Sequence, residues 1–308
     1  MGASVKIFHD FFQPIVTTPT TLTIGMFDGV HMGHQHLIRS VVESAHSNGR
    51  TSGLVTFFPH PRRVIGCSGP EYLTSTEEKI EILNQLGLDF VVLVNFTLEV
   101  SKIPAAHFVN LLVENLNMKE LCIGHDFALG YQREGNEGFL YSRGVELGFS
   151  VYSITNPLTI DGQLVSSSCI REALQAGDIQ RVNAFLGRQF RITGIVEPCT
   201  SGNKFHDANV VRMFVEQDHA KPKDGLYIAR INFNRISYDA ITEFKTYEFE
   251  GKNNNSIKIL LPEHTCDIND TICFMDIRDR LFSEPRVLYT QSVFTSPLID
   301  MIVGSRFC

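Results

Sequence analysis

The sequence predicts an α/β fold with a doubly wound parallel sheet, followed by a small antiparallel β-barrel domain. In residues 1–187, short β-rich runs alternate with helical patterns, whereas in residues 188–308 most runs alternate apolar and polar residues. Strands that alternate with helices form βαβ units, which place parallel strands in one sheet. Short strands of alternating polarity separated by turn residues are typical of antiparallel barrels and sandwiches. We therefore expect two domains, 1–187 and 188–308.

Five apolar runs in the first domain have the length and composition of buried strands. They are TLTIGM (21–26), SGLVTF (52–57), FVVLVNF (90–96), ELCIGH (120–125) and SVYSIT (150–155). Helical patterns lie between them, at residues 33–49, 75–87, 105–117 and 137–148. In the first of these, Leu37, Ile38, Val41 and Val42 recur at helical spacing, and Gly49 marks the end of the helix. Parallel sheets of this kind bind ligands at the carboxyl ends of their strands, at a topological switch point.

The second domain contains six runs with the period-2 alternation of strands. They are residues 188–198, 210–217, 225–234, 238–251, 256–263 and 271–279. Turn signals separate them, at Asp224-Gly225 and at residues 251–255. We expect residues 284–305 to close the domain as a broken helix.

Composition and charge limit the classes of function. The chain has 308 residues, 43% of them hydrophobic and 20% charged, with a net charge of −7. These values are typical of a soluble globular protein, and the negative charge argues against general binding to nucleic acid or to an anionic membrane. The seven cysteines are odd in number and none is spaced C-x-x-C, which disfavours a disulfide framework or a cysteine-rich zinc site. We expect a reduced, cytoplasmic protein without signal peptide or membrane span.

The turn after the first predicted strand contains the strongest chemical signal. In TLTIGMFDGVHMGHQHLI (21–38), Gly25 ends the strand, and Gly29 and Gly33 bracket His31. Glycines allow the backbone to approach a ligand closely, and a helix that begins near Gly33 directs its N–H groups towards that ligand. His31 and His34 are three residues apart, so they share a face of the helix start. The turn therefore predicts an anion site that suits a polyphosphate.

A metal pair and two surface histidines are the alternatives to a phosphate site in this turn. A metal site would need a third and a fourth ligand at recognisable spacing, and His36 faces elsewhere on the helix. We therefore expect no metal bound directly by protein residues. The glycines and the strand-to-helix placement favour phosphate.

Four segments of the chain resemble, in order, the motifs of one family. They are GMFDGVHMGH (25–34), TFFPHP (56–61), IGHDFALGYQREG (123–135) and VSSSCIREALQAGDIQRVNAFLGRQFRITGIV (165–196). These are similar to G-x-F-D-G-x-H-x-G-H, T-F-x-P-H-P, G-x-D-F-x-F-G-x-x-R-x-G, and S-S-T-x-I-R with a linker ending L-G-R. The motifs belong to the bacterial FAD synthetases, within the H-x-G-H nucleotidyltransferases. H-x-G-H alone is weakly specific, but four ordered motifs identify a Rossmann-like nucleotidyltransferase domain.

The resemblance implies adenylyl transfer from ATP to FMN, which yields FAD and pyrophosphate, with Mg²⁺ bound to the ATP. ATP and FMN would be its partners, and we expect neither nucleic acid nor membrane. It implies catalytic roles for His31, His34 and Arg171. It implies a nucleotide site formed by Gly25, Phe27, Asp28, Gly29, Gly33, Asp126, Ser167 and Ser168, and a flavin site formed by Phe58, Pro59, His60 and Pro61.

Some of these residues also suit ordinary structural roles. Ser167 and Ser168 suit the start of any serine-capped helix, Asp126 suits a turn, and residues 58–61 suit a rigid proline turn. The chain also departs from the family pattern. Ser168 replaces the usual Thr but keeps a hydroxyl, Cys169 is at a variable position, and Ala128 and Leu129 replace residues that are often aromatic or polar.

The second domain resembles the riboflavin kinase barrel of bifunctional members, but three of its motifs are damaged. His206 and Asp207 stand where the G-x-P-T-A-N motif has Pro and Thr, and residues 231–244 lack the glycine and the R-P-T-F of another motif. Lys258 stands where the family has the Glu that acts as a base on riboflavin, and a protonated lysine cannot accept that proton. Glu263 would be the base only if the register differs by several residues. The D-G-x-Y strand at residues 224–227 survives, so we expect the fold without kinase activity.

The leading hypothesis is therefore an FMN adenylyltransferase that carries a degenerate riboflavin kinase barrel. The alternatives are a fully bifunctional riboflavin kinase/FAD synthetase and a flavin- or nucleotide-binding regulator. A further alternative is adenylyl transfer to another acceptor, such as a nicotinate or pantetheine phosphate.

Overall fold

The computed structural model describes eleven stretches of the chain. They are residues 4–66, 68–125, 127–154, 156–198, 209–216, 218–233, 236–245, 248–249, 252–253, 256–261 and 271–281. The chain divides into two compact units, Met1–Ser166 and Ser167–Cys308. The division lies before the expected boundary at residue 187, so the two helices between these points are grouped with the barrel.

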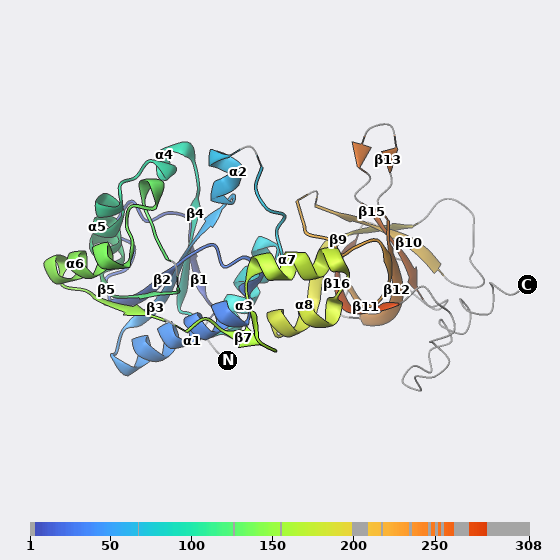
Figure 1. The fold of residues 1–308 in the computed structure, drawn as a ribbon, viewed down its shortest axis with the longest axis horizontal. Helices are drawn as coiled ribbons and strands as arrows, with labels where there is room; N and C mark the ends of the chain where they lie inside the picture. The colour runs from blue at the N-terminus through green and yellow to red at the C-terminus, as the bar shows by residue number, and fades with distance from the viewer. Residues whose placement is uncertain are drawn as a thin grey trace, which may run out of the picture. The chain divides into compact units, whose positions relative to one another are not determined.

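The first unit is built on six parallel strands, as the alternation of strand and helix patterns predicted (Figure 1). In sheet order they are β1 (Lys6–Phe8), β4 (Phe90–Asn95), β3 (Thr51–Phe58), β2 (Thr20–Ile24), β5 (Met118–Ile123) and β6 (Ser150–Ser153). Five of these were predicted to within two residues at each end, whereas β1, with three residues, is too short to show a period.

The sheet reverses its direction of growth next to β2. From β2 the chain adds β3 and β4 on one side, and then β5 and β6 on the other. The carboxyl ends of β2 and β5 therefore flank the topological switch point, where open α/β sheets bind their ligands.

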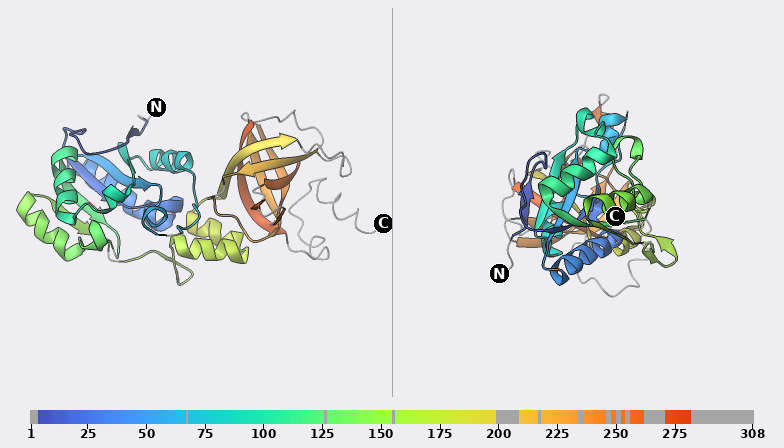
Figure 2. Two further views of the ribbon diagram at one scale, coloured as in Figure 1. Left: turned by 90° about the horizontal axis from the view of Figure 1, so that it is seen from above. Right: turned by 90° about the vertical axis from the view of Figure 1, so that its left-hand side faces the viewer.

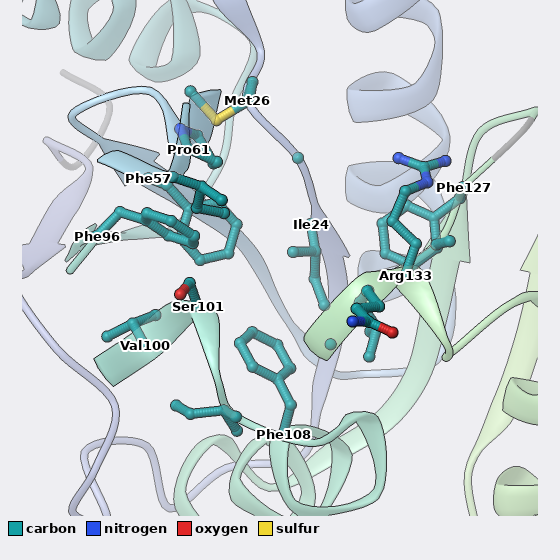
Figure 3. A pocket seen from close by; sticks show the side chains of 17 residues that line it. Ile24, Met26, Phe57, Pro61, Phe96, Val100, Ser101, Phe108, Phe127 and Arg133 are labelled. Atoms are coloured by element: carbon teal, nitrogen blue, oxygen red, sulfur yellow. The ribbon is translucent and has the colours of Figure 1, made fainter. Parts of the chain in front are cut away.

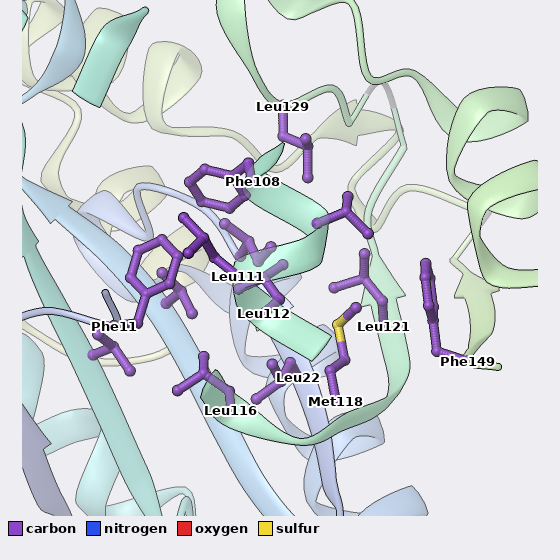
Figure 4. Packing of buried hydrophobic residues seen from close by; sticks show 14 of the residues in the cluster. Phe11, Leu22, Phe108, Leu111, Leu112, Leu116, Met118, Leu121, Leu129 and Phe149 are labelled. Carbon is purple, nitrogen blue, oxygen red and sulfur yellow. The ribbon is translucent and has the colours of Figure 1, made fainter. Parts of the chain in front are cut away.

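The longer helices cover both faces of the sheet. They are α1 (Met32–Ser47), α3 (Thr76–Gln85), α5 (Ala105–Leu116) and α6 (Glu137–Leu147), and the short helical segments are η1 (Asp28–Val30), α2 (Pro61–Ile65), α4 (Leu98–Ser101) and η2 (Tyr131–Arg133). One core joins residues of α1 and α3, and a second joins residues of α5 and α6 (Figure 4). Within β4, Val91 belongs to the first core and Val92 to the second, because successive strand residues point to opposite faces.

The second unit contains a closed barrel of six antiparallel strands, visible in the left view of Figure 2, as the sequence predicted. The strand order is β10 (Asn209–Val215), β15 (Ser256–Leu261), β12 (Ile236–Phe244), β11 (Gly225–Phe233), β16 (Thr271–Leu281) and β9 (Phe190–Pro198), and β9 pairs with β10 to close the barrel. Two small hairpins complete the described strands, β7 (Thr159–Ile160) with β8 (Gln163–Leu164), and β13 (Glu248–Phe249) with β14 (Lys252–Asn253). The helix expected at residues 284–305 lies outside the described residues.

Helices α7 (Ser167–Ala176) and α8 (Ile179–Leu186) precede the barrel. Asn183 of α8 donates hydrogen bonds from Nδ2 to the carbonyl oxygens of Ile277 and Arg278 in β16, at 3.1 and 3.3 Å. Its Oδ1 accepts the N–H of Phe190 in β9 at 2.8 Å. These bonds attach α8 to two barrel strands and explain its grouping with the second unit. No helix in the described part of the chain is long and apolar enough to cross a membrane.

Candidate active site

The turn from β2 to α1 has an unusual backbone. Phe27, Gly29 and Val30 have positive φ values of 47°, 80° and 37°. A residue with a side chain is strained in this region by about 1–3 kcal/mol, and a β-branched residue rarely occurs there. Phe27 and Val30 are 2% and 0% exposed, so core packing holds both in place. The turn is therefore a fixed scaffold for the two histidines that follow.

The two histidines meet at the start of α1. His31 is the N-cap residue, and its Nδ1 accepts the N–H of His34 at 3.3 Å. The two imidazole rings stack with centroids 3.6 Å apart and planes 17° apart, and the ring of Phe27 packs edge-on against His34. The structure therefore brings together the pair that the three-residue spacing predicted to share a face.

The electrostatic surroundings of His34 keep its ring neutral at physiological pH. Burial lowers its pKa well below the ordinary 6.5, and the neighbouring His31 and Lys79 lower it further. Its Nδ1 is buried and has no hydrogen-bond partner among the described residues. An anion that arrives beside this ring would favour the charged form and so draw a proton onto it.

The predicted glycines leave space around these rings. A Cβ at Gly33 would lie 3.3 Å from the ring of His31, and a Cβ at Gly25 would lie 3.1 Å from the ring of Phe27. Both distances are tighter than ordinary contacts, so any side chain at either position would push an aromatic ring aside. Glycine therefore suits both positions, and the close approach of a ligand to this backbone stays a prediction.

The side chain of Asp28 is hydrogen-bonded within the protein and the residue is 3% exposed. Its Oδ1 accepts the N–H of Leu73 at 3.0 Å, and the N–H of the adjacent Gly29 donates to Thr74 Oγ1 at 3.2 Å. These bonds tie the turn to the chain segment before α3. The contact of Asp28 with a nucleotide stays a prediction.

Lys79, on α3, is a site residue that the sequence analysis missed. It is 5% exposed, and its Nζ donates to the Met26 carbonyl oxygen at 3.0 Å, which also accepts from Thr56 Oγ1 at 3.1 Å. Burial lowers the pKa of Lys79, while the charge of Asp28 opposes that shift. The available signal was its position in the apolar stripe of α3, three and four residues before the buried Ile82 and Leu83.

A pocket of about 440 Å³ opens at the switch point, next to the turn (Figure 3). Its walls are mainly apolar, and Ser101, Gln132 and Arg133 are its polar side chains. Figure 3 shows Met26, Phe57, Pro61 and Phe96 on one side, and Phe127 and Arg133 on the other. The remaining lining residues are Ile24, Gly25, Ile65, Val100, Ile103, Phe108, Ala128, Leu129 and Gly130.

Only one of the four predicted flavin residues, Pro61, lines this pocket. Phe58 is 46% exposed, and Pro59 follows it through a cis peptide bond. His60 caps α2 by accepting the N–H of Arg62 on Nδ1 at 3.1 Å, and its own N–H donates to the hydroxyl of Tyr72. The walls come instead from aromatic residues near the ends of β3 and β4, among other elements, a signal that the switch-point rule could have found. Ala128 and Leu129, the two departures from the family pattern, both line the pocket.

Three of the remaining predicted residues belong to the second unit. Ser167 and Ser168 open α7 and Arg171 lies one turn later, all in the second unit. Asp126 lies outside the described residues. Among the residues that are described, no group of three His, Cys, Asp or Glu side chains could hold a metal ion.

In the barrel, Lys258 lies on β15 directly opposite Glu243 of β12 and Arg212 of β10. Its Nζ is 3.9 Å from Glu243 Oε2, and the two side chains are 41% and 32% exposed. The lysine therefore belongs to an open cross-strand ion pair. His206, Asp207 and Glu263 lie outside the described residues.

A solved structure is similar to the whole fold. It is a macrolide-efflux protein from Streptococcus pneumoniae, with a TM-score of 0.82, 17% sequence identity, and coverage of 99% of this chain and 98% of that one. At this identity the likeness concerns the fold alone.

Several curated proteins are similar in sequence, each described as a bifunctional riboflavin kinase/FMN adenylyltransferase. The Bacillus subtilis protein is 30% identical over 72% of this chain and 70% of its own length. The Escherichia coli K12 protein is 34% identical over 57% and 56%, and the Buchnera aphidicola (Schizaphis graminum) protein is 32% identical over 61% and 60%. The match thus spans less than two thirds of the latter two relatives.

The family model for FAD synthetase matches residues 14–169, about half of the chain. This stretch contains five of the six strands of the parallel sheet, β2 to β6, together with the histidine turn and the residues that line the apolar pocket. Together with the Bacillus subtilis match, it shows that the chain belongs to the FAD synthetase family.

Proposed function

We propose that the first unit transfers the adenylyl group of ATP to FMN, giving FAD and pyrophosphate. An oxygen of the FMN phosphate attacks the α-phosphorus of ATP, and the bond from that phosphorus to the bridging oxygen breaks. The electron pair of the broken bond leaves with pyrophosphate, so no covalent intermediate with the protein is needed. The observation that carries this proposal is the placement of an apolar pocket and a phosphate-type turn at the same end of β2.

The pocket supports binding of a flavin. A volume of about 440 Å³ with walls of phenylalanine and aliphatic side chains suits a flat, largely apolar ring system. Arg133 and Gln132 supply hydrogen-bond donors at one side of the pocket. The ring would be held by burial and its polar edge by these two side chains.

The turn supports binding of the ATP phosphates. Helix α1 has 16 residues and follows its N-cap residue His31, so its first N–H groups and the positive end of its dipole favour an anion there. His34 is neutral before the anion arrives, and a bound triphosphate would favour its protonation. The two imidazoles would then stabilise the negative charge that develops as pyrophosphate leaves.

Residues of the second unit complete the proposal. Ser167, Ser168 and Arg171 would contact the phosphates, because a guanidinium matches two phosphate oxygens at once. Asp126 would line the nucleotide side. Mg²⁺ would enter bound to ATP, as the counter-ion of its phosphates.

The barrel would have no riboflavin kinase activity. Lys258 carries the wrong charge for a base, and its cross-strand contact with Glu243 supports a surface role. The damage at His206 and Asp207 supports the same conclusion independently. Because the relatives are described as bifunctional, retained kinase activity is the alternative that most needs a direct test.

One experiment separates these functions. The purified chain is incubated with ATP, Mg²⁺ and either FMN or riboflavin, and the products are identified by mass spectrometry. We expect FAD and pyrophosphate from FMN, and no FMN from riboflavin. FMN formed from riboflavin would refute the loss of the kinase. Binding of FMN and ATP without turnover would refute the transferase activity and favour a regulator. Adenylylation of a nicotinate or pantetheine phosphate, but not of FMN, would refute FMN as the acceptor.

A further inference from the structure

Three residues of one segment hold the turn that presents His31 and His34. We call Leu73, Thr74 and Lys79 the 73–79 clamp. The Leu73 N–H donates to Asp28 Oδ1 at 3.0 Å, Thr74 Oγ1 accepts the N–H of Gly29 at 3.2 Å, and Lys79 Nζ donates to the Met26 carbonyl oxygen at 3.0 Å. All three bonds end on residues 26–29, which include the strained Phe27. The clamp therefore opposes relaxation of a turn that its own backbone disfavours.

The charge of Lys79 is costly for a residue that only packs. The residue is 5% exposed and lies on the same helix face as Ile82 and Leu83. Removing an ammonium group from water is unfavourable, and an apolar side chain of similar volume often serves packing as well or better. A lysine at this position suggests a task that needs a hydrogen-bond donor and a positive charge.

Lys79 faces both parts of the proposed site. The carbonyl of Met26 accepts its hydrogen bond, and Met26 also lines the apolar pocket. The carboxylate of Asp28 attracts its charge, while that charge disfavours protonation of His34. Among the described residues, the charged and titratable groups that lower the pKa of His34 are His31 at the start of its own helix and Lys79 on α3.

We propose that the 73–79 clamp positions the His31–His34 pair for adenylyl transfer, with Lys79 as its charged member. Lys79 is a positioning residue that does not contact substrate. Its hydrogen bond to the Met26 carbonyl holds the Met26–Asp28 turn in place, and its charge keeps the site electropositive. Because Met26 also lines the pocket, this hydrogen bond couples the position of the histidine pair to one wall of the pocket. The proposal rests on the function proposed above.

The test compares Lys79→Met with Lys6→Met. Both variants remove one positive charge, but Lys6 is exposed on β1, outside the clamp. We expect Lys79→Met to lower kcat for FAD formation about 100-fold, the loss typical of a small misplacement of reacting groups, with KM for ATP changed less than about threefold. Lys6→Met leaves both constants unchanged. A kcat for Lys79→Met within about twofold of the wild-type value would overturn the proposal.

A second readout does not depend on turnover. NMR titration of the unliganded protein follows the ring of His34, whose pKa should rise in Lys79→Met, because a nearby positive charge is gone, and stay fixed in Lys6→Met. An unchanged His34 titration would overturn the electrostatic role of Lys79. If the wild-type protein forms no FAD, the proposed function fails, and this titration still decides whether Lys79 acts on the histidine pair.

Thr74→Val keeps the test valid if Lys79→Met does not fold. It removes only the hydroxyl that accepts from Gly29 N–H, with little change in shape. We expect kcat to fall about tenfold, and the midpoint of thermal unfolding to fall by several degrees while the protein stays folded, because a buried N–H loses an acceptor. Wild-type kcat in this variant would overturn the clamp.

Discussion

A lysine in the first unit and a lysine in the barrel differ in their burial and in their contacts. In the first unit, Lys79 is 5% exposed and bonds a backbone carbonyl at 3.0 Å. In the barrel, Lys258 is 41% exposed and stands 3.9 Å from its carboxylate partner. The buried lysine is costly unless each of its contacts is kept, whereas the exposed one adds little to stability. The first arrangement is typical of a functional site, and the second is typical of a solvated barrel surface.

The loss of kinase activity that we propose for the barrel is compatible with an intact barrel fold. The barrel is closed by backbone pairing of six strands and by buried residues such as Tyr227, Ile231 and Met275. None of these interactions needs the side chain at position 258. The histidine site, in contrast, contains a few polar contacts and two glycines at which a Cβ would be tight against an aromatic ring.

The strongest test of the comparison is removal of both histidines from the first site. His31→Ala combined with His34→Ala should lower FAD formation at least about 1000-fold, because two groups that stabilise developing charge are lost. His36→Ala is the matched control, since His36 is exposed on the same helix. Steady-state FAD formation from FMN and ATP measures the effect, and circular dichroism checks that α1 remains folded. Unchanged FAD output in the double variant would contradict the assignment of the site.

The next effect concerns the pocket and separates its two ligands. Val100→Phe adds bulk to the lining, so KM for FMN should rise about tenfold, while KM for ATP stays near its wild-type value. Val145→Phe serves as the control, because Val145 is 88% exposed on α6. Initial rates with each substrate varied in turn provide the measurement. An increase confined to ATP would place the flavin elsewhere.

The stability of the protein should depend on pH through His34 in the first site. Burial, followed by His31 and Lys79, lowers the pKa of His34 well below 6.5. Below pH 6.5 the unfolded chain binds a proton that folded His34 does not, so this residue lowers stability as pH falls from 6.5 towards its folded pKa, and has no such effect above 6.5. One proton gives a slope of at most about 1.4 kcal/mol per pH unit.

The measurement is urea unfolding of the wild-type protein and of His34→Gln between about pH 5 and 8. The stability of His34→Gln should fall less than that of the wild-type protein as the solution is acidified. His36→Gln is the matched control, since His36 is exposed on the same helix. Parallel curves for the wild-type protein and His34→Gln would show that His34 is not held neutral by its surroundings.

The smallest expected effect is in the barrel. Lys258→Met should change the free energy of unfolding by no more than about 0.5 kcal/mol, since the ion pair with Glu243 is long and open to solvent. FAD formation should be unchanged. Urea unfolding measures the free energy of unfolding, and the assay with FMN and ATP measures FAD formation. A loss of several kcal/mol would mean that Lys258 has a structural task in the barrel comparable to that of Lys79.

The sequence by itself determined the architecture and the histidine turn. Period-3.6 and period-2 patterns placed the longer helices and most strands to within a few residues, because burial of one face is encoded locally. The three-residue spacing of His31 and His34 likewise indicated that the two side chains meet, because residues close in sequence are close in space at a strand-to-helix turn. Such features need only short-range information.

Only the tertiary structure decided which distant segments complete the site. Lys79 reaches Met26 across 53 residues of chain, and the pocket combines residues that follow β2, β3, β4 and β5. Phe58, in contrast, stands beside the pocket residue Phe57 in sequence but is largely exposed, because successive residues of a strand point to opposite faces. Local pattern fixes how a segment folds, whereas the sheet order fixes which segments end side by side.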